Sequence, residues 1–177
     1  MKPRPAEDGD RPKRPRMHAS EVEVFDGVAG VTIGDTLLTL WRTPARPERI
    51  RRVTAWTEAL IRDTPGRIAA CQFILSTASP PNRAARAETL KGFRLVEPHA
   101  RRLITVPVGG AIWHRLVRTI IRTGVVLWGR SKLIKVAGSE NEAFSLLMDV
   151  ATDRSPDRRE LRAALASLHA ALEPGEQ

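Results

Sequence analysis

Short apolar runs alternate with longer amphipathic segments along most of this chain, and this alternation constrains the fold more than any other feature. Three such runs, "RIAACQFILS", "RRLITVPV" and "SKLIKVA", are each followed by a segment whose apolar residues recur every three or four positions. A run that is apolar throughout is typical of a strand buried on both faces, as in a parallel sheet covered by helices. The pattern therefore predicts an α/β fold with a mostly parallel sheet and helical crossovers.

The region before these runs is expected to add a hairpin and a helix. A Gly-Asp pair is a turn signal between two short alternating segments, so we expect residues 28–33 and 37–41 to pair as a hairpin. Residues 47–64 carry apolar side chains at helical spacing, with a proline in the first turn and Pro-Gly after the end. Arg49 is expected to lie largely outside the apolar stripe of this helix. The sheet is thus predicted to be mixed, with helices flanking it.

The chain divides into three segments by composition. Residues 1–21 are rich in proline and charge and are expected to form a disordered tail. Residues 22–153 are expected to form the single α/β domain. Residues 154–177 are expected to form an extra amphipathic helix and a short tail, with a leucine stripe at Leu161, Leu165, Leu168 and Leu172. That helix is too short for a free-standing coiled coil, so it docks on the domain, which we favour, or forms a homodimer with a second copy.

The net charge of +9 is concentrated in the middle of the chain. Residues 30–150 contain 19 basic and 9 acidic side chains, whereas both ends are close to neutral. Such a domain carries a positive field that attracts anionic partners. Nucleic acid is not the partner we expect, because tyrosine is absent and phenylalanine is scarce, so base-stacking surfaces are hard to build.

Several classes of function are not expected from this composition. Cys71 is the only cysteine and lies in an apolar run, so we expect a buried thiol without a disulfide or a metal. The histidines are scattered and no nucleophile has the expected partners, so we expect neither an enzyme nor a cofactor. The N-terminus lacks the apolar region of a signal peptide and no apolar run is long enough to span a membrane. A cytoplasmic location is therefore the default expectation.

The segment "VPVGGAIWHRLVRTIIRTGVVLWGR" is predicted to be a strand, a glycine turn and a helix. An apolar stripe that we expect to face inward contains Trp113, Leu116, Val117, Ile120, Ile121 and Gly124. Arg115, Arg118 and Arg122 share another face, which meets solvent or a partner.

The glycine turn before this helix is a second candidate site. Gly109-Gly110 would let the chain turn sharply and leave backbone amides free to bind an anion, next to His114. We favour a tight turn without a ligand, and a surface position for the histidine, because two glycines fall short of a phosphate-binding motif.

The chain also resembles a known family. The stretches "IGDTLLTLWRTP", "PGRIAACQFIL", "SPPNRAARAETL" and the run from "VGGAIWHRL" to "SENEAFSLLM" are similar to small STAS/CRAL-TRIO-like (SpoIIAA-like) proteins of unassigned function from GC-rich bacteria such as myxobacteria. The resemblance covers about residues 28–151 and implies a STAS-like domain. In STAS domains that antagonise anti-sigma factors, a serine is phosphorylated in an Asp-Ser-x-Gly turn after a central strand. The corresponding "ILSTASPPNRAAR" offers Ser76 and Ser79, but the aspartate and glycine are missing.

Together these features predict a non-enzymatic regulatory or protein-interaction module. We expect its basic helix face to dock an acidic partner protein, with Trp113 or Trp128 as an apolar centre. Two alternatives stay open, namely peripheral binding to anionic lipid or a membrane surface through the same face, and binding of a small anionic ligand at the glycine turn.

Overall fold

The computed structural model describes residues 19–78, 80–128 and 133–173, and for residues 122–128 it describes the backbone only. These residues form a six-stranded sheet in the order β1-β2-β3-β4-β5-β6, which is also the order along the chain. The elements are β1 (Glu23–Phe25), β2 (Val28–Ile33), β3 (Thr36–Trp41), α1 (Pro47–Asp63), β4 (Ile68–Leu75), α2 (Arg83–Val96), η1 (Glu97–His99), β5 (Ala100–Val108), α3 (Ala111–Trp128), β6 (Ile134–Val136), α4 (Glu140–Met148) and α5 (Arg158–Leu172).

The sheet is mixed, as the sequence predicts. β1, β2 and β3 pair antiparallel, whereas β3, β4, β5 and β6 are all parallel to their neighbours. Each parallel connection contains a helix, as such crossovers require. The predicted α/β class is therefore confirmed for the described residues, and β1 is a short edge strand that the sequence pattern did not predict.

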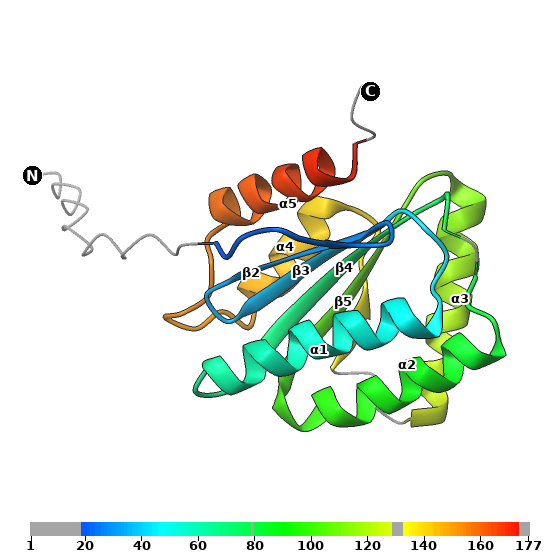
Figure 1. Ribbon diagram of the computed structural model, residues 1–177, viewed down its shortest axis with the longest axis horizontal. Helices are drawn as coiled ribbons and strands as arrows, with labels where there is room; N and C mark the ends of the chain where they lie inside the picture. The colour runs from blue at the N-terminus through cyan, green and yellow to red at the C-terminus, as the bar shows by residue number, and fades with distance from the viewer. Residues whose placement is uncertain (1–18, 79, 129–132, 174–177) are drawn as a thin grey trace, which may run out of the picture.

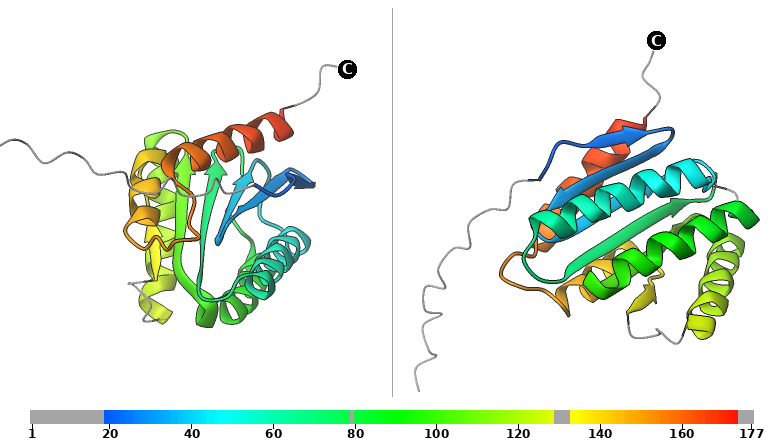
Figure 2. Two further views of the ribbon diagram at one scale, coloured as in Figure 1. Left: turned by 90° about the vertical axis from the view of Figure 1, so that its left-hand side faces the viewer. Right: turned by 60° about the horizontal axis from the view of Figure 1, so that its bottom comes forward.

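Two helical layers cover the sheet. α1 and α2 lie side by side on one face, and α4 and α5 lie on the other, with α5 across β2 and β3 (Figure 1). α3 lies beyond α2, on the side away from the β2–β3 hairpin (Figure 2). Alternate residues of β3 divide between the two cores, so Leu37 packs with the α1 and α2 side while Leu38 and Leu40 pack with the α4 and α5 side.

The leucine stripe of the last helix docks on the same domain. Leu161, Leu165 and Leu168 are buried in the core formed with β2 and β3, and Leu172 is partly buried. Asp157 and Glu160 form a capping box that starts α5, and an Arg42 guanidinium donates to the Leu172 carbonyl near its end. The structure thus shows the favoured arrangement, in which the helix docks on its own domain. A homodimer through the leucine stripe would require α5 to leave this position.

A buried ion pair closes the edge of the sheet where the parallel strands begin. Asp35, between β2 and β3, accepts hydrogen bonds from Arg101 at 2.7 Å and from the hydroxyls of Thr152 and Ser155 at 2.6 and 3.3 Å. Its carboxylate is 3% exposed and the Arg101 side chain 11%. Three distant segments, the hairpin turn, β5 and the α4–α5 loop, thus meet at one carboxylate, which we call the Asp35 clamp.

Some expected orientations are wrong. Arg49 is buried rather than outside the α1 stripe, because its guanidinium pairs with Asp26 at 2.7 Å. Leu116 was expected inside but is 39% exposed. At the start of α4, Ser139 accepts from the Glu142 amide and Glu142 accepts from the Gly138 amide.

Replacing Asp35 by asparagine is expected to lower the free energy of unfolding at neutral pH by about 3 kcal/mol, because Arg101 would keep a buried charge without its counterion. Burial alone raises the pKa of Asp35, but the hydrogen bonds from Arg101 and Thr152 and the Arg101 charge outweigh it, so the pKa is lowered. A lowered pKa stabilises the fold above the unfolded-state value of about 4, and this stabilisation is lost as the pH falls through the folded-state value.

Urea unfolding of both proteins between about pH 7 and about pH 2 measures this effect. The difference in free energy of unfolding between wild type and Asp35→Asn should become smaller below about pH 4. Asp63→Asn, at the exposed end of α1, is the matched control and should leave stability nearly unchanged. If this free-energy difference did not change with pH, the result would contradict the claim that the ionised form of Asp35 stabilises the clamp.

Candidate functional site

The connections that follow the parallel strands meet at one edge of the sheet. Because β3, β4, β5 and β6 are parallel, the turns into α1, α2, α3 and α4 all lie at their carboxyl ends. This is the edge where open α/β sheets usually bind ligands. Both sites that the sequence predicts, the glycine turn and the start of the arginine helix, lie here.

The glycine turn contacts the predicted serine turn. Gly109 has φ of +149°, and a Cβ placed on it would lie 2.6 Å from the Cβ of Ser76. Only glycine fits both the backbone conformation and this approach. Gly110 has open space around its Cβ position. The turns after β4 and β5 therefore pack directly against each other.

Of the two candidate phosphorylation sites, Ser76 is exposed in the turn after β4, the position that the resemblance implies. Its neighbour Thr77 donates its hydroxyl to the Arg42 carbonyl at 2.7 Å and so holds the turn to the end of β3. Ser79 lies outside the described residues. The serine prediction thus has one accessible hydroxyl, at a rigid turn.

One side of α3 is anchored to the sheet. The Trp113 indole N–H donates to the Ile74 carbonyl at 3.1 Å, at the end of β4, and Val117 is buried one turn later. The partly buried Trp113 is therefore occupied within the domain. Its role as the apolar centre of a docking surface stays a prediction, and the side chain of Trp128 lies outside the described residues.

The other side of α3 combines exposed apolar and basic groups. Ile112 is 86% exposed and Leu116, one turn later, is 39% exposed. Arg115 and Arg118 are also exposed on this helix, and the Arg118 guanidinium extends toward Gly138. No ion pair joins either guanidinium to a carboxylate within the described part of the chain. We call these four residues the α3 face. Arg122 lies further along α3, where side chains are not described.

A cavity of about 200 Å³ opens at the same edge, between the starts of α3 and α4 and the end of α5. Its apolar lining comes from the ends of β4 and β5 and from α5, and consists of Phe73, Val106, Pro107, Val108 and Leu165. Gly109 and Gly138 contribute backbone, and the polar lining residues are His114, Ser139, Glu140 and His169. We call this space the edge cavity.

The edge cavity brings together two histidines that are far apart in the sequence. His114 is on α3, and His169 is on the last turn of α5. Sequence reasoning placed His169 on the last helix but had no signal that this helix would return to the glycine turn. The one acidic side chain in the lining, Glu140, is 3.7 Å from the guanidinium of Arg162, which offsets its charge.

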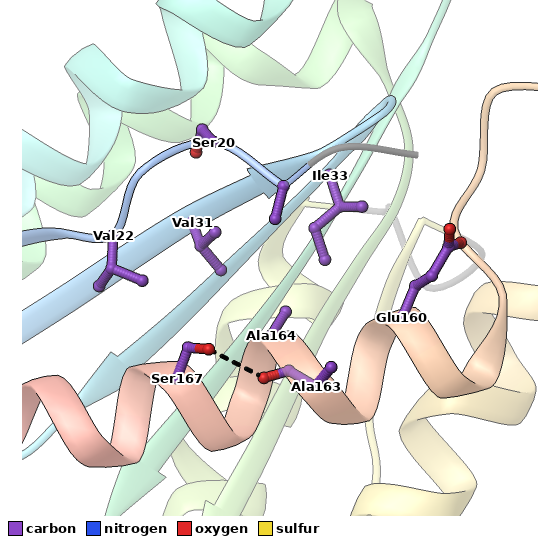
Figure 3. A pocket seen from close by; sticks show the side chains of 9 residues that line it. Ser20, Val22, Val31, Ile33, Glu160, Ala163, Ala164 and Ser167 are labelled. Atoms are coloured by element: carbon purple, nitrogen blue, oxygen red, sulfur yellow. Dashed lines mark hydrogen bonds between the residues drawn. The ribbon is translucent and has the colours of Figure 1, made fainter. Parts of the chain in front are cut away.

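A second cavity, of about 190 Å³, lies between the N-terminal segment, β2 and α5. Figure 3 shows that its walls are mainly small or aliphatic side chains, including Val22, Val31 and Ala164. Two of its polar side chains form hydrogen bonds within α5 and its N-terminal cap, because Ser167 donates to the Ala163 carbonyl and Glu160 accepts from the Asp157 amide. This cavity therefore offers little chemistry to a ligand.

Other reactive groups give no site among the residues that the structure covers. Cys71 is buried as expected, and burial raises the pKa of its thiol. In the described ranges no group of three or more histidine, cysteine, aspartate or glutamate side chains is arranged to hold a metal ion. The helices seen there include none with both the length and the apolar character of a membrane span.

Comparison of the chain with protein-family models, with curated proteins and with solved structures finds no match.

Gly109→Ala is expected to lower the free energy of unfolding by about 1–3 kcal/mol, because the new Cβ meets Ser76 and the backbone is held at positive φ. Gly110→Ala is the matched control, and it should cost less than about 1 kcal/mol since its Cβ position is open. Chemical unfolding of both variants measures the difference. Equal stabilities would contradict the close packing of the two turns.

Proposed function

We propose that this protein is a non-enzymatic interaction module that docks an acidic partner protein through the α3 face. The observation that carries the proposal is the exposure of Ile112 and Leu116 on a helix that also carries two exposed arginines without an ion-pair partner among the described residues. Only four large apolar side chains of the described chain are exposed, and two of them lie one turn apart on this helix.

The mixed character of the α3 face suits protein docking. Exposed apolar side chains that cluster with arginine are typical of interfaces, in which apolar groups form the centre and charges the rim. Isolated surface ion pairs contribute little, so Arg115 and Arg118 would mainly select and orient the partner while Ile112 and Leu116 supply buried area. Both functions occur here on a single helix.

The charge distribution favours an acidic partner. Residues 30–150 carry ten more basic than acidic side chains, and α3 contains no acidic residue. A positive field of this kind accelerates the approach of an acidic surface and disfavours a basic one. The partner that we propose presents carboxylates around an apolar pocket that receives Ile112.

We also propose that the domain is STAS-like and regulatory. Its support is the succession of parallel strands with helical crossovers, and the exposed Ser76 directly after the central strand β4. The position of Ser76 beside Gly109 would let a phosphate there alter the charge next to α3. A cytoplasmic location and a homodimer through the C-terminal helix remain predictions.

The α3 face is tested by capture of partners from a lysate of the source cell at low and moderate salt. Ile112→Ser/Leu116→Ser and Arg115→Glu/Arg118→Glu should each weaken capture of the same protein by at least about tenfold, because they remove the apolar centre and the charge complement separately. The arginine pair should also remove most of the salt dependence.

Arg83→Glu/Arg94→Glu is the matched control, because it makes the same charge change on exposed positions of the neighbouring α2. It should leave capture unchanged. If the control lost as much capture as the arginine variant, the effect would come from net charge alone. If both α3 variants kept full capture, the α3 face would be excluded as the docking surface. Sedimentation with anionic but not neutral vesicles, lost in the arginine variant, would instead favour the lipid alternative.

A further inference from the structure

We infer that the edge cavity binds a small monocarboxylate, with the carboxylate at the histidine rim and a short apolar tail against the floor. The cavity lining includes none of Ile112, Arg115 and Leu116, and Arg118 only flanks its rim. The inference therefore does not depend on the proposed partner.

The position of the edge cavity favours a ligand. It lies at the carboxyl ends of β4 and β5, where Val106, Val108 and Gly109 form one wall. α4 and α5 close it from the other face of the sheet. Five separate elements, β4, β5, α3, α4 and α5, thus converge on one concave space at the edge where α/β proteins bind small molecules.

The size of the cavity limits the ligand. A volume of about 200 Å³ lies below the roughly 300–1,000 Å³ of sites for drug-sized molecules. The floor is formed by Phe73, Val106 and Leu165, which are all buried. A fully polar anion such as phosphate would place polar oxygens against this apolar floor, whereas a tail of two to four carbons, about the size of a single aliphatic side chain, would fill it.

The chemistry of the rim selects a carboxylate. His114 and His169 approach from α3 and α5 and each can donate a ring N–H. Arg118 lies 3.8 Å from the position that a Cβ on Gly138 would take, so a guanidinium flanks the same rim. Glu140 faces Arg162 at 3.7 Å, and Glu142 accepts the Gly138 amide at 2.6 Å, so both nearby acids are engaged by donors of the protein.

The experiment is titration of the isolated full chain with butyrate, followed by two-dimensional amide NMR. Butyrate should cause saturable shifts that concentrate on Gly109, Gly138 and Ser139. Butyramide, which has the same shape without the charge, and inorganic phosphate should cause none at the same concentrations. Because this mapping uses the wild-type protein, it does not depend on whether a variant folds.

His114→Ala and His169→Ala should each weaken butyrate binding by about tenfold, the loss typical of one hydrogen bond to a charged group. His99→Ala is the matched control, because His99 is exposed at the opposite edge of the sheet, before β5, and it should leave the affinity unchanged. Absence of saturable shifts, binding that is insensitive to both cavity histidines, or preference for phosphate would each overturn the proposal.

Discussion

The carboxylate of Asp35 is the contact on which the arrangement of this domain depends. The β2–β3 turn, β5 and the α4–α5 loop share few other polar contacts, yet all three reach this one group through Arg101, Thr152 and Ser155. The backbone of the same residue pairs with Ala69 and Arg154. Since burying a charge is unfavourable unless it is paired and hydrogen-bonded, the clamp specifies one relative placement of these segments. It thereby holds α5 across β2 and β3.

The two edges of the parallel sheet consequently serve different purposes. At the amino ends of the strands, Asp35 and Arg101 form a buried ion pair that joins three segments of the chain. At the carboxyl ends, close packing of Gly109 on Ser76 and the Trp113 bond to Ile74 fix where α3 begins. That placement leaves the α3 face toward solvent and the edge cavity beside it. Contacts at the carboxyl edge itself thus position the groups available for recognition there.

The periodicity of apolar residues predicted most of the fold, because their spacing in the local sequence indicates whether one or both faces of an element are buried. The hairpin, the central strand β4 and the buried leucines of α5 all follow from that pattern. Periodicity could not show that Leu116 would be exposed, because an apolar stripe indicates which residues share a face of a helix but not how much of the sheet lies beneath that face. The neighbouring strand β6 has only three residues, so the sheet next to α3 is short. Nor could it place His114 and His169 around one cavity or pair Asp35 with Arg101, because these residues belong to segments separated by dozens of residues. The candidate site was therefore predicted in part, through Gly109 and the arginines.

Site-specific photo-crosslinking from position 112 in living cells tests the central claim most directly, because it reports contacts of the α3 face without altering its charge. A crosslinkable side chain at Ile112 should yield one dominant adduct with an acidic protein, and the same group at Leu95, which is 54% exposed on α2, should not. An equal pattern of adducts from both positions, or none from Ile112, would contradict the assignment of α3 as the docking surface.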